Sequence, residues 1–511
     1  MELRRFQPLA ILLIVVGVFF RFIGLGSLMY SHDEAYTSLR AAGYTGSEAI
    51  DSIWDGRIIT RDAIQYFLKP IGDKDVFDTI SVIARSEPQL SPLYFILAHY
   101  WMRLIGSSPS AMRGLSAFLS LFAIPGMYWL SMELFRSRRI ALVSTVLISL
   151  SPFMILLAKD ARPYSLWASV TLLSSAAFMA AIRKNKIFDW GGYSLFIIIG
   201  LYSHLMFALV IIAHGLYMIA FKEFRLERRF IKYLIASFLA FLTFIPWLLQ
   251  LITRWNFVMG RIDLVDTQIS MLHIQHWVIN IASPFIDLYI GERNIIPYIL
   301  RVPVLLLIGC GIIFLVVRAP KRIWVFLLLL IGVSTLPFML SDLLRGGVLS
   351  IQGRYFVSAN VAIILVIAYL LVEKLSESRA IPPYRWHLIT MLLLVAQLGS
   401  AINIVQAETW WTKKISWIDP QIGHVLNQES HPVLIVNGLW PTDLGDVLAI
   451  SYMVDKDVNF LLYQTPEIEE LPVGFSNIYW FHQTYWDFLD SENGNQFQAT
   501  EVIPYFLWRI D

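Results

Sequence analysis

The chain has 511 residues, of which 57% are hydrophobic and only 15% charged, and its mean hydropathy of +0.61 excludes an ordinary soluble protein. The formal net charge is +2, and the lysines and arginines lie in a few short clusters, which excludes a basic nucleic-acid-binding face. The single cysteine, Cys310, lies in an apolar run, so neither a disulfide framework nor a thiolate metal site is expected. The composition therefore indicates an integral membrane protein.

The amino-terminal segment joins a basic start to a long apolar run, as a signal peptide does. Residues 1–5 include Arg4 and Arg5, and residues 8–20 are mainly apolar. The run has no small-residue cleavage site, and many more apolar segments follow it. We therefore expect an uncleaved first helix whose amino end faces the cytoplasm.

Further apolar segments approach the length of about 20 residues that crosses a bilayer. They are residues 113–134, 140–157, 164–182, 189–203, 205–221, 233–251, 297–317, 323–340, 355–372 and 387–405. With the first helix, they predict an all-α polytopic membrane protein of about eleven spans.

Basic clusters alternate with these spans, at residues 136–139, 183–186, 225–232, 318–322 and 374–385. The positive-inside rule places all of them in the cytoplasm. The regions left outside are residues 27–110, 158–163, 254–296 and 341–354, followed by the tail. The apolar stretch 92–105 is too short to cross, so we expect it to lie along the outer surface or dip into it.

The tail is less apolar than the rest of the chain. Residues 432–436, 459–463 and 477–481 have the composition of short strands between helical and turn segments. We therefore predict a membrane domain over residues 1–405, with outer loops 27–110 and 254–296, and a small extracytoplasmic α/β domain over residues 406–511.

Two adjacent carboxylates, Asp33 and Glu34, follow the first span. Adjacent side chains diverge, so one carboxylate can face a cavity as a base or ligand while the other supports the local fold through hydrogen bonds. The alternative is a helix cap, in which Ser31 or Asp33 caps a helix that begins at Glu34. Both interpretations remain open from the sequence.

Other charged residues are predicted at the outer ends of spans. Glu87 precedes a proline-initiated apolar segment, for which the alternative is an ordinary helix start. Lys159, Asp160 and Arg162 crowd into a very short turn between two spans. Charges at that depth cost several kcal/mol unless they are paired or hydrated, so this turn indicates a cavity.

Imidazoles and arginines complete the polar residues of the predicted outer face. His273 and His276 are spaced so that at most one imidazole can join a carboxylate around a divalent cation, and a lone histidine there is more often an interfacial hydrogen-bonding group. His204, in a short turn, is a second candidate ligand. Arg345 and Arg354 stand at the outer end of a span, where a guanidinium can bind phosphate or reach the lipid headgroups.

Acids beside fixed cations at headgroup depth suit an enzyme that binds an anionic lipid carrier and deprotonates a hydroxyl group. The residues that meet this description on one predicted side are Asp33, Glu34, Glu87, Lys159, Asp160, Arg162 and Arg354.

The order and spacing of these motifs resemble the membrane glycosyltransferases of the C-type fold, especially the protein-O-mannosyltransferase and aminoarabinose-transferase-like group. The resemblance covers most of residues 8–373. The matching segments are residues 32–36, 87–94, 113–135, 151–152, 160–164, 202–204 and 354–355.

The resemblance implies a hexosyl- or pentosyltransferase in the cytoplasmic (inner) membrane, surrounded by membrane lipids. It would move a sugar from a polyprenyl-phosphate carrier to a glycan, lipid or protein acceptor outside that membrane, usually with inversion. Asp33 then becomes the general base or an organiser of the acceptor hydroxyl, with Glu34 in support. The implied donor-binding residues are Glu87, Tyr94, Lys159, Asp160, Arg162, Tyr164, Arg354 and Tyr355.

A divalent cation is the one cofactor that the resemblance implies. Some members of the family hold a cation between an acid near the Pro-Leu motif and a histidine of a later loop. Here these residues correspond to Glu87 with His273 or His276, and His204 is the second candidate. Without the cation, Lys159, Arg162 or Arg354 can stabilise the charge of the leaving phosphate.

The chain departs from the family pattern in two places. Relatives commonly have His-Pro-Pro-Leu-Tyr where this chain has Leu-Ser-Pro-Leu-Tyr at residues 90–94, and Gln-Glu-Ala-Arg where it has Lys-Asp-Ala-Arg at residues 159–162. Two alternatives to the transferase remain. One is a non-catalytic or transport subunit of cell-surface polysaccharide assembly with the same fold. The other is an oligosaccharyltransferase-like enzyme that recognises peptide.

Overall fold

A computed structural model describes residues 3–72, 74–221, 228–256, 269–289, 295–376, 383–437, 443–464, 471–475, 477–481 and 499–510. The chain forms two compact units. The first, called the helical unit below, comprises Met1–Leu25, Glu87–Tyr94 and Arg113–Gln406. The second, called the mixed unit, comprises Gly26–Ser86, Phe95–Met112 and Ala407–Asp511.

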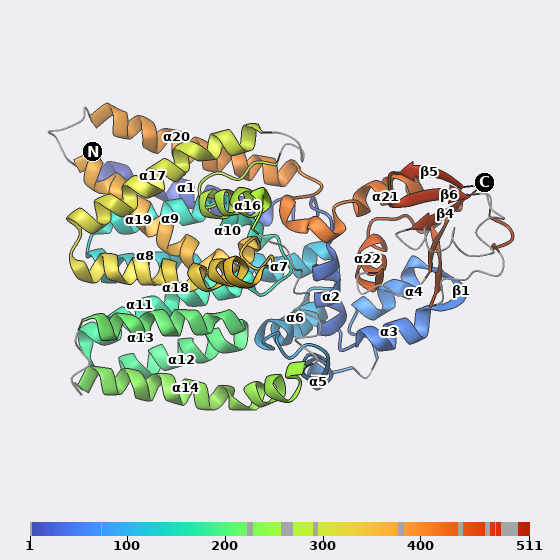
Figure 1. Cartoon of the computed structure of the whole chain (residues 1–511), viewed down its shortest axis with the longest axis horizontal. Coiled ribbons are helices and arrows are strands. Elements are labelled where there is room, and N and C mark those ends of the chain that lie inside the picture. Colours follow the sequence, from blue (N-terminus) through green and yellow to red (C-terminus); the bar gives the residue numbers. More distant parts are fainter. Residues whose placement is uncertain are drawn as a thin grey trace. The chain divides into compact units, whose positions relative to one another are not determined.

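Helices form the helical unit, and most of them run roughly parallel to one another (Figure 1). Seven helical segments of the described residues are long and apolar enough to cross a membrane, and the bent pair α9–α10 makes eight if it is one span. These helices are α7 (Pro109–Ser120) with α8 (Ala123–Phe135), α9 (Arg138–Leu150), α10 (Pro152–Ala158), α11 (Tyr164–Lys184), α14 (Arg228–Thr253), α17 (Ile296–Arg318), α18 (Lys321–Arg345), α19 (Val357–Ser376) and α20 (Pro383–Gln406).

Three apolar helical stretches are shorter. They comprise most of α1 (Leu3–Phe22), α12 (Ile187–Ser203), and η2 (Leu205–Phe207) with α13 (Ala208–Ala220). Each predicted span therefore corresponds to a helix, while the number of crossings, about eleven, stays a prediction. The helix α6 (Leu93–Leu104), in the stretch expected not to cross, has 12 residues and is too short to span a bilayer at 1.5 Å per residue.

Burial separates central from peripheral helices in this unit. The most apolar windows of α11 and α19 are 89% and 94% buried, whereas those of α14, α17 and α20 are each 28% buried. Large apolar side chains such as Phe238 and Leu239 of α14 are consequently exposed. Soluble proteins rarely expose continuous apolar surface of this kind, which suits contact with lipid.

A proline sets the bend between α9 and α10. Ser151 has ψ 120°, outside the helical range, because the ring of a following proline disfavours the helical conformation. Pro152 then begins α10, and the two helix axes differ by 55°. Directly after α10 comes the short turn that carries Lys159, Asp160 and Arg162.

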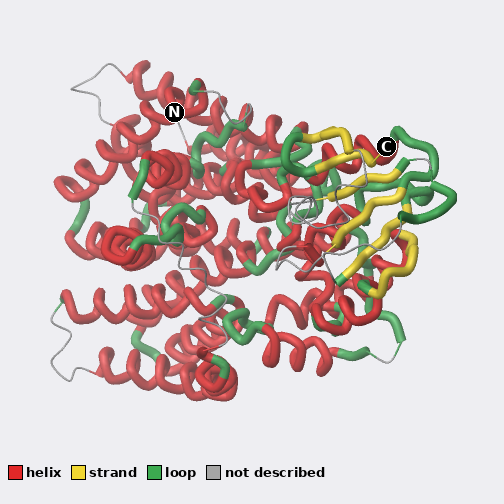
Figure 2. Tube along the Cα trace, turned by 45° about the vertical axis from the view of Figure 1, so that its right-hand side comes forward, coloured by secondary structure: helices red, strands yellow, loops and turns green. Residues whose placement is uncertain are grey.

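The mixed unit contains a six-stranded sheet of order β1-β3-β2-β4-β6-β5 (Figure 2). Its strands are β1 (Asp55–Thr60), β2 (Val433–Asn437), β3 (Asn459–Tyr463), β4 (Ile478–Phe481), β5 (Ala499–Ile503) and β6 (Leu507–Ile510). Strand β2 runs parallel to β3 and β4, and the other pairs are antiparallel.

The helices of the mixed unit come from both the first loop and the tail. They are α2 (His32–Ala41), α3 (Gly46–Ile53), α4 (Arg61–Gln65), η1 (Tyr66–Leu68), α5 (Val76–Ser86), most of α6, η4 (Trp411–Ser416), α21 (Asp419–Asn427) and α22 (Asp443–Ile450). The helix α16 (Met271–Ala282) and the short η3 (Gly353–Phe356) belong to the helical unit.

Three predicted strands are confirmed as β2, β3 and β4. Strands β1, β5 and β6 were not predicted, because β1 and β5 are largely exposed and lack a clear alternation, and β6 has four residues. Strand β1 pairs with β3, so the first loop and the tail share one sheet. Of the predicted basic clusters and outer loops, residues 225–227, 257–268, 290–294 and 377–382 lie outside the described residues.

Candidate functional site

The acidic pair lies in the first turn of α2, and the two carboxylates have different surroundings. Ser31 is the N-cap residue, and Glu34 accepts hydrogen bonds from the Ser31 backbone N–H at 3.1 Å and from its Oγ at 3.0 Å. Glu34 is fully buried and also accepts from Nζ of Lys413 at 2.9 Å. The cap expected as one alternative is present at Ser31, but the helix begins at His32 rather than at the predicted Glu34, and Glu34 is the third helical residue, which closes a capping box.

Asp33 is the neighbouring residue in the same turn and is half-buried. Its backbone carbonyl accepts a hydrogen bond from Oγ1 of Thr37 at 3.0 Å. Its carboxylate belongs to the first turn of a helix, where the N–H groups favour negative charge. Glu34 therefore stabilises the turn, and the catalytic role of Asp33 stays a prediction.

Replacing Glu34 tests how strongly this turn depends on the buried carboxylate. We expect Glu34→Gln to lower the free energy of unfolding by about 3 kcal/mol, because it leaves the Lys413 ammonium buried without its counter-charge. Glu48 provides a matched control, since it forms the same capping box with Thr45 and pairs with Lys74 but is largely exposed. Glu48→Gln should lower the free energy of unfolding by less than about 1 kcal/mol. Thermal unfolding in detergent measures both, and equal losses would contradict this account.

His32, on the other side of Asp33, is held by the tail of the chain. Its backbone N–H donates to Oγ of Ser416 at 2.9 Å, and its Nδ1 lies 3.4 Å from Oδ1 of Asp446. The ring fits closely against α22, because a Cβ at Gly445 would lie 2.2 Å from His32 Nδ1. Both neighbours of Asp33 are therefore fixed by residues of the tail.

A second buried acid, Asp419, lies near Asp446. Burial, together with the negative charge of Asp446, raises the pKa of Asp419 well above its usual value, against the opposing hydrogen bond of Ser416. Asp419 is therefore expected to retain its proton at pH values where an exposed aspartate is charged. Sequence reasoning missed His32, Lys413, Ser416, Asp419 and Asp446, because only the tertiary fold brings them together.

The raised pKa of Asp419 predicts the direction of a pH effect. A folded state that binds this proton more tightly than the unfolded state loses stability as pH rises above the unfolded pKa of about 4. Asp419→Asn removes that loss, so its melting temperature should exceed that of the wild type increasingly as pH rises from 4 to 8. The exposed Asp457→Asn is the control and should show a constant difference. If the difference in melting temperature between Asp419→Asn and the wild type is also constant across this pH range, Asp419 is not protonated in the folded protein.

In the helical unit, three predicted cationic or imidazole residues come together. The positive charges of Arg162 and Arg354 both act on His204, and with the larger effect of burial they lower its pKa to about 3. Trp167 stacks on the His204 ring with centroids 4.3 Å apart and an interplanar angle of 5°. We call Arg162, His204 and Arg354 the arginine–histidine cluster. It holds two fixed positive charges beside a neutral imidazole.

The tyrosines of the predicted donor site lie next to this cluster. The Tyr164 ring centroid is 5.7 Å from that of His204 and 5.8 Å from Cζ of Arg162. The Tyr355 ring lies 5.8 Å from Cζ of Arg354. Tyr94 is fully buried and shares a 2.7 Å hydrogen bond with Oγ of Ser116, which also donates to the Arg162 carbonyl at 3.3 Å. These contacts link three segments that the sequence pattern selected separately.

Lys159 and Asp160 have other partners in the same turn. The Lys159 ammonium donates to the carbonyls of Ile23 and Gly24, after α1, and Arg113 donates to the next carbonyl, that of Leu25, at 2.8 Å. Burial, with a smaller effect of the Arg113 charge, lowers the Lys159 pKa to about 8. Asp160 is half-buried, and its carbonyl accepts from the Arg162 N–H at 2.7 Å. Lys159 thus holds the loop after α1.

The residues proposed for a cation are also in the helical unit. Glu87 is half-buried and precedes Pro88, whose carbonyl accepts a hydrogen bond from Trp247 at 3.0 Å. His273 Nδ1 accepts from the Ser270 N–H at 3.2 Å and its Nε2 lies 2.8 Å from the Gly347 carbonyl. Both ring nitrogens of His273 are therefore engaged by the backbone.

His276 is buried on the same helix α16. Within the described part of the chain, no group of three or more His, Cys, Asp or Glu side chains is arranged to hold a metal ion. A divalent cation between Glu87 and a histidine stays a prediction. Asp33 and Glu34 belong to the mixed unit, and all the other predicted site residues belong to the helical unit.

Comparisons with known proteins support the fold. Residues 86–249 match the model of the family described as dolichyl-phosphate-mannose-protein mannosyltransferase. No curated protein sequence matches the chain. The crystal structure of ArnT from Cupriavidus metallidurans in the apo state is similar, with a TM-score of 0.53 at 12% identity over 99% of this chain and 98% of that chain.

Two ligand-bound structures are similar at lower scores. The structure of ArnT from Cupriavidus metallidurans bound to undecaprenyl phosphate matches with a TM-score of 0.48 at 12% identity, over 99% of this chain and 98% of that chain. The structure of the oligosaccharyltransferase AglB from Archaeoglobus fulgidus, in complex with an inhibitory peptide and a dolichol-phosphate, matches with a TM-score of 0.46 at 12% identity over 90% of this chain. This chain spans only 64% of the AglB chain.

The apo ArnT match, together with the apolar helices and the family-model match, defines the class of protein. The chain is a multi-pass membrane protein with the C-type glycosyltransferase fold and a small sheet-containing carboxyl-terminal region. The fold class expected from the sequence is confirmed.

Proposed function

We propose that this protein is a glycosyltransferase of the cytoplasmic membrane that moves a sugar from a polyprenyl-phosphate carrier to an acceptor on the extracytoplasmic face, with inversion. The observation that carries the proposal is that the charges of Arg162 and Arg354 both act on His204, in a chain with the C-type fold. Two fixed guanidinium groups suit the phosphate of a lipid carrier, which they can bind through paired hydrogen bonds.

His204 would contribute a hydrogen bond without adding charge. Its Nδ1 accepts from the Met206 N–H at 3.2 Å, so the neutral ring carries its proton on Nε2. The stacked Trp167 fixes the plane of the ring. The cluster would thus supply two charged donors and one neutral donor to the phosphate oxygens, and the departing carrier would need no separate acid.

Asp33 would supply the base on the acceptor side. In an inverting transfer, the acceptor oxygen forms a bond to the anomeric carbon as the bond from that carbon to the phosphate oxygen breaks. Asp33 would take the hydroxyl proton, and the polyprenyl phosphate would leave with the electron pair of the broken bond. A divalent cation held by Glu87 with His273 or His276, with His204 as the second candidate, would add positive charge on the donor side.

Carrier binding tests the arginine–histidine cluster without knowledge of the sugar. We expect Arg162→Gln and Arg354→Gln each to weaken the affinity for undecaprenyl phosphate by about tenfold or more, since a hydrogen bond to a charged group contributes about 1.5–3 kcal/mol. Arg345→Gln is the matched control, because Arg345 is an exposed arginine at the end of α18. Native mass spectrometry in detergent gives the affinities, and losses no larger than that of the control would contradict the donor site.

Sugar transfer tests the base. With a panel of undecaprenyl-phosphate hexoses and pentoses in membranes, Asp33→Asn should reduce transfer by about 100-fold or more while carrier binding stays unchanged. Full transfer by Asp33→Asn would remove Asp33 from the catalytic role. A wild-type protein that binds the carrier but transfers none of the sugars would instead support a non-catalytic subunit.

A further inference from the structure

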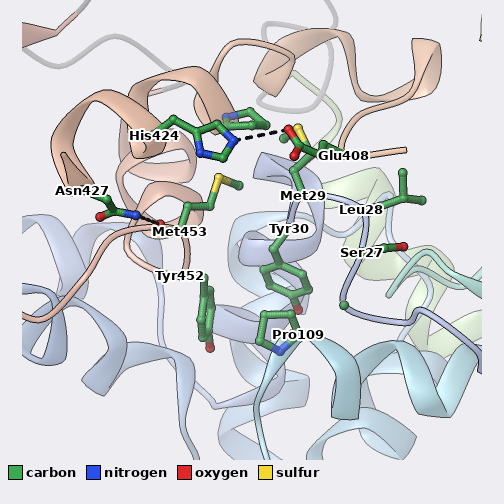
Figure 3. A pocket seen from close by; sticks show the side chains of 12 residues that line it. Ser27, Leu28, Met29, Tyr30, Pro109, Glu408, His424, Asn427, Tyr452 and Met453 are labelled. Atoms are coloured by element: carbon green, nitrogen blue, oxygen red, sulfur yellow. Dashed lines mark hydrogen bonds and ion pairs between the residues drawn. The ribbon is translucent and has the colours of Figure 1, made fainter. Parts of the chain in front are cut away.

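The mixed unit contains a cavity of about 300 Å³ beside α21 (Figure 3). Residues 26–30, which lead into the acidic motif, form one wall, and α21 and the turn after α22 form the others. The Met29 N–H donates to the Glu408 carbonyl at 2.7 Å, which joins the first loop to the start of the tail at the cavity. Its volume is at the lower end of the range for small-ligand sites, about 300–1,000 Å³.

Two tyrosine rings form part of the cavity wall. Tyr30 and Tyr452 meet edge to face with centroids 5.3 Å apart. Their hydroxyls are engaged elsewhere, that of Tyr30 with Oγ of Ser38 at 2.6 Å and that of Tyr452 with the Ser107 carbonyl at 3.1 Å. Tyr30 is only 2% exposed and Met29 only 6%, so the half-buried Tyr452 ring and the Met453 side chain are the apolar surface that the cavity offers to a ligand.

Polar groups line the opposite edge. Pro420, His424 and Asn427 recur on one face of α21, at the four- and three-residue spacing of a helix. His424 Nε2 lies 3.3 Å from Oε2 of Glu408, and the two side chains are 64% and 68% exposed (Figure 3). The rim thus presents an imidazole and a carboxylate that solvent and ligand can both reach.

We propose that this cavity binds one neutral or amino hexopyranose ring of an acceptor glycan. A pyranose has an apolar C–H face, which suits the Tyr452 ring and Met453, and hydroxyl groups on its edge, which can donate to Glu408 and accept from His424. An acyl chain would form no hydrogen bond with Glu408 or His424. A uronic acid would place a second carboxylate near Glu408, and the two negative charges would repel each other.

The inference rests on the proposed function, since it names the class of the acceptor. The cavity and Asp33 belong to the same unit. Tyr30 in the cavity wall shares a hydrogen bond with Ser38 of α2, the helix whose first turn contains Asp33. The unit that contains the proposed base would therefore also bind the molecule to be deprotonated.

The test is a binding experiment on the full-length protein in detergent. Methionine methyl groups are labelled with ¹³C, and Met29→Leu and Met453→Leu identify the two cavity signals. The probes are the methyl glycosides of mannose, glucose, galactose, glucosamine, N-acetylglucosamine and glucuronic acid. We expect at least one neutral or amino glycoside to shift both signals saturably, and the glucuronide to shift neither.

Glu408→Gln is the decisive variant, with the exposed Glu48→Gln of the same unit as control. Glu408→Gln should lower the affinity for the amino or neutral glycoside by about tenfold, whereas Glu48→Gln should leave that affinity unchanged. The proposal is overturned if none of the probes shifts the two signals, if the glucuronide binds as well as the others, or if Glu408→Gln has no effect. Because no donor is present, failure of sugar transfer and failure of this binding are separate outcomes.

Discussion

The ion pair between Glu34 and Lys413 is the interaction on which the mixed unit most depends. Both side chains are buried, and each ion loses several kcal/mol of hydration on folding. The attraction between the two charges, together with the hydrogen bonds of Glu34 to Ser31, offsets this cost. The pair joins residues 379 positions apart, so the tail contributes directly to holding the first turn of α2.

That constraint explains why the first loop and the tail form one unit. Strand β1 pairs with β3, His32 contacts Ser416 and Asp446, and Glu34 contacts Lys413. Asp33 is therefore presented from a turn fixed on both sides by residues of the tail. In the helical unit, burial and the charges of two guanidinium groups keep His204 neutral.

The sequence predicted what depends on local pattern. Apolar length located the helices, and β-branched and aromatic runs located β2, β3 and β4. Ser31 and Glu34 have the spacing of a capping box, yet the sequence did not separate capping from catalysis, because both use a carboxylate in a first turn. The sequence did not predict the roles of Lys413, Asp446 and Asp419. No local pattern in the tail indicates that it contacts His32 and Glu34 of the first loop. Arg162 and Arg354 were selected by their positions near span ends, but their common electrostatic effect on His204 depends on the packing of segments distant in sequence.

The central claim is that the arginine–histidine cluster binds the phosphate of a lipid carrier. A cryo-electron microscopy structure of the protein with undecaprenyl phosphate tests it most directly. The account predicts phosphate density within hydrogen-bond distance of both Arg162 and Arg354. Well-defined phosphate density elsewhere, with both arginines unchanged, would contradict it.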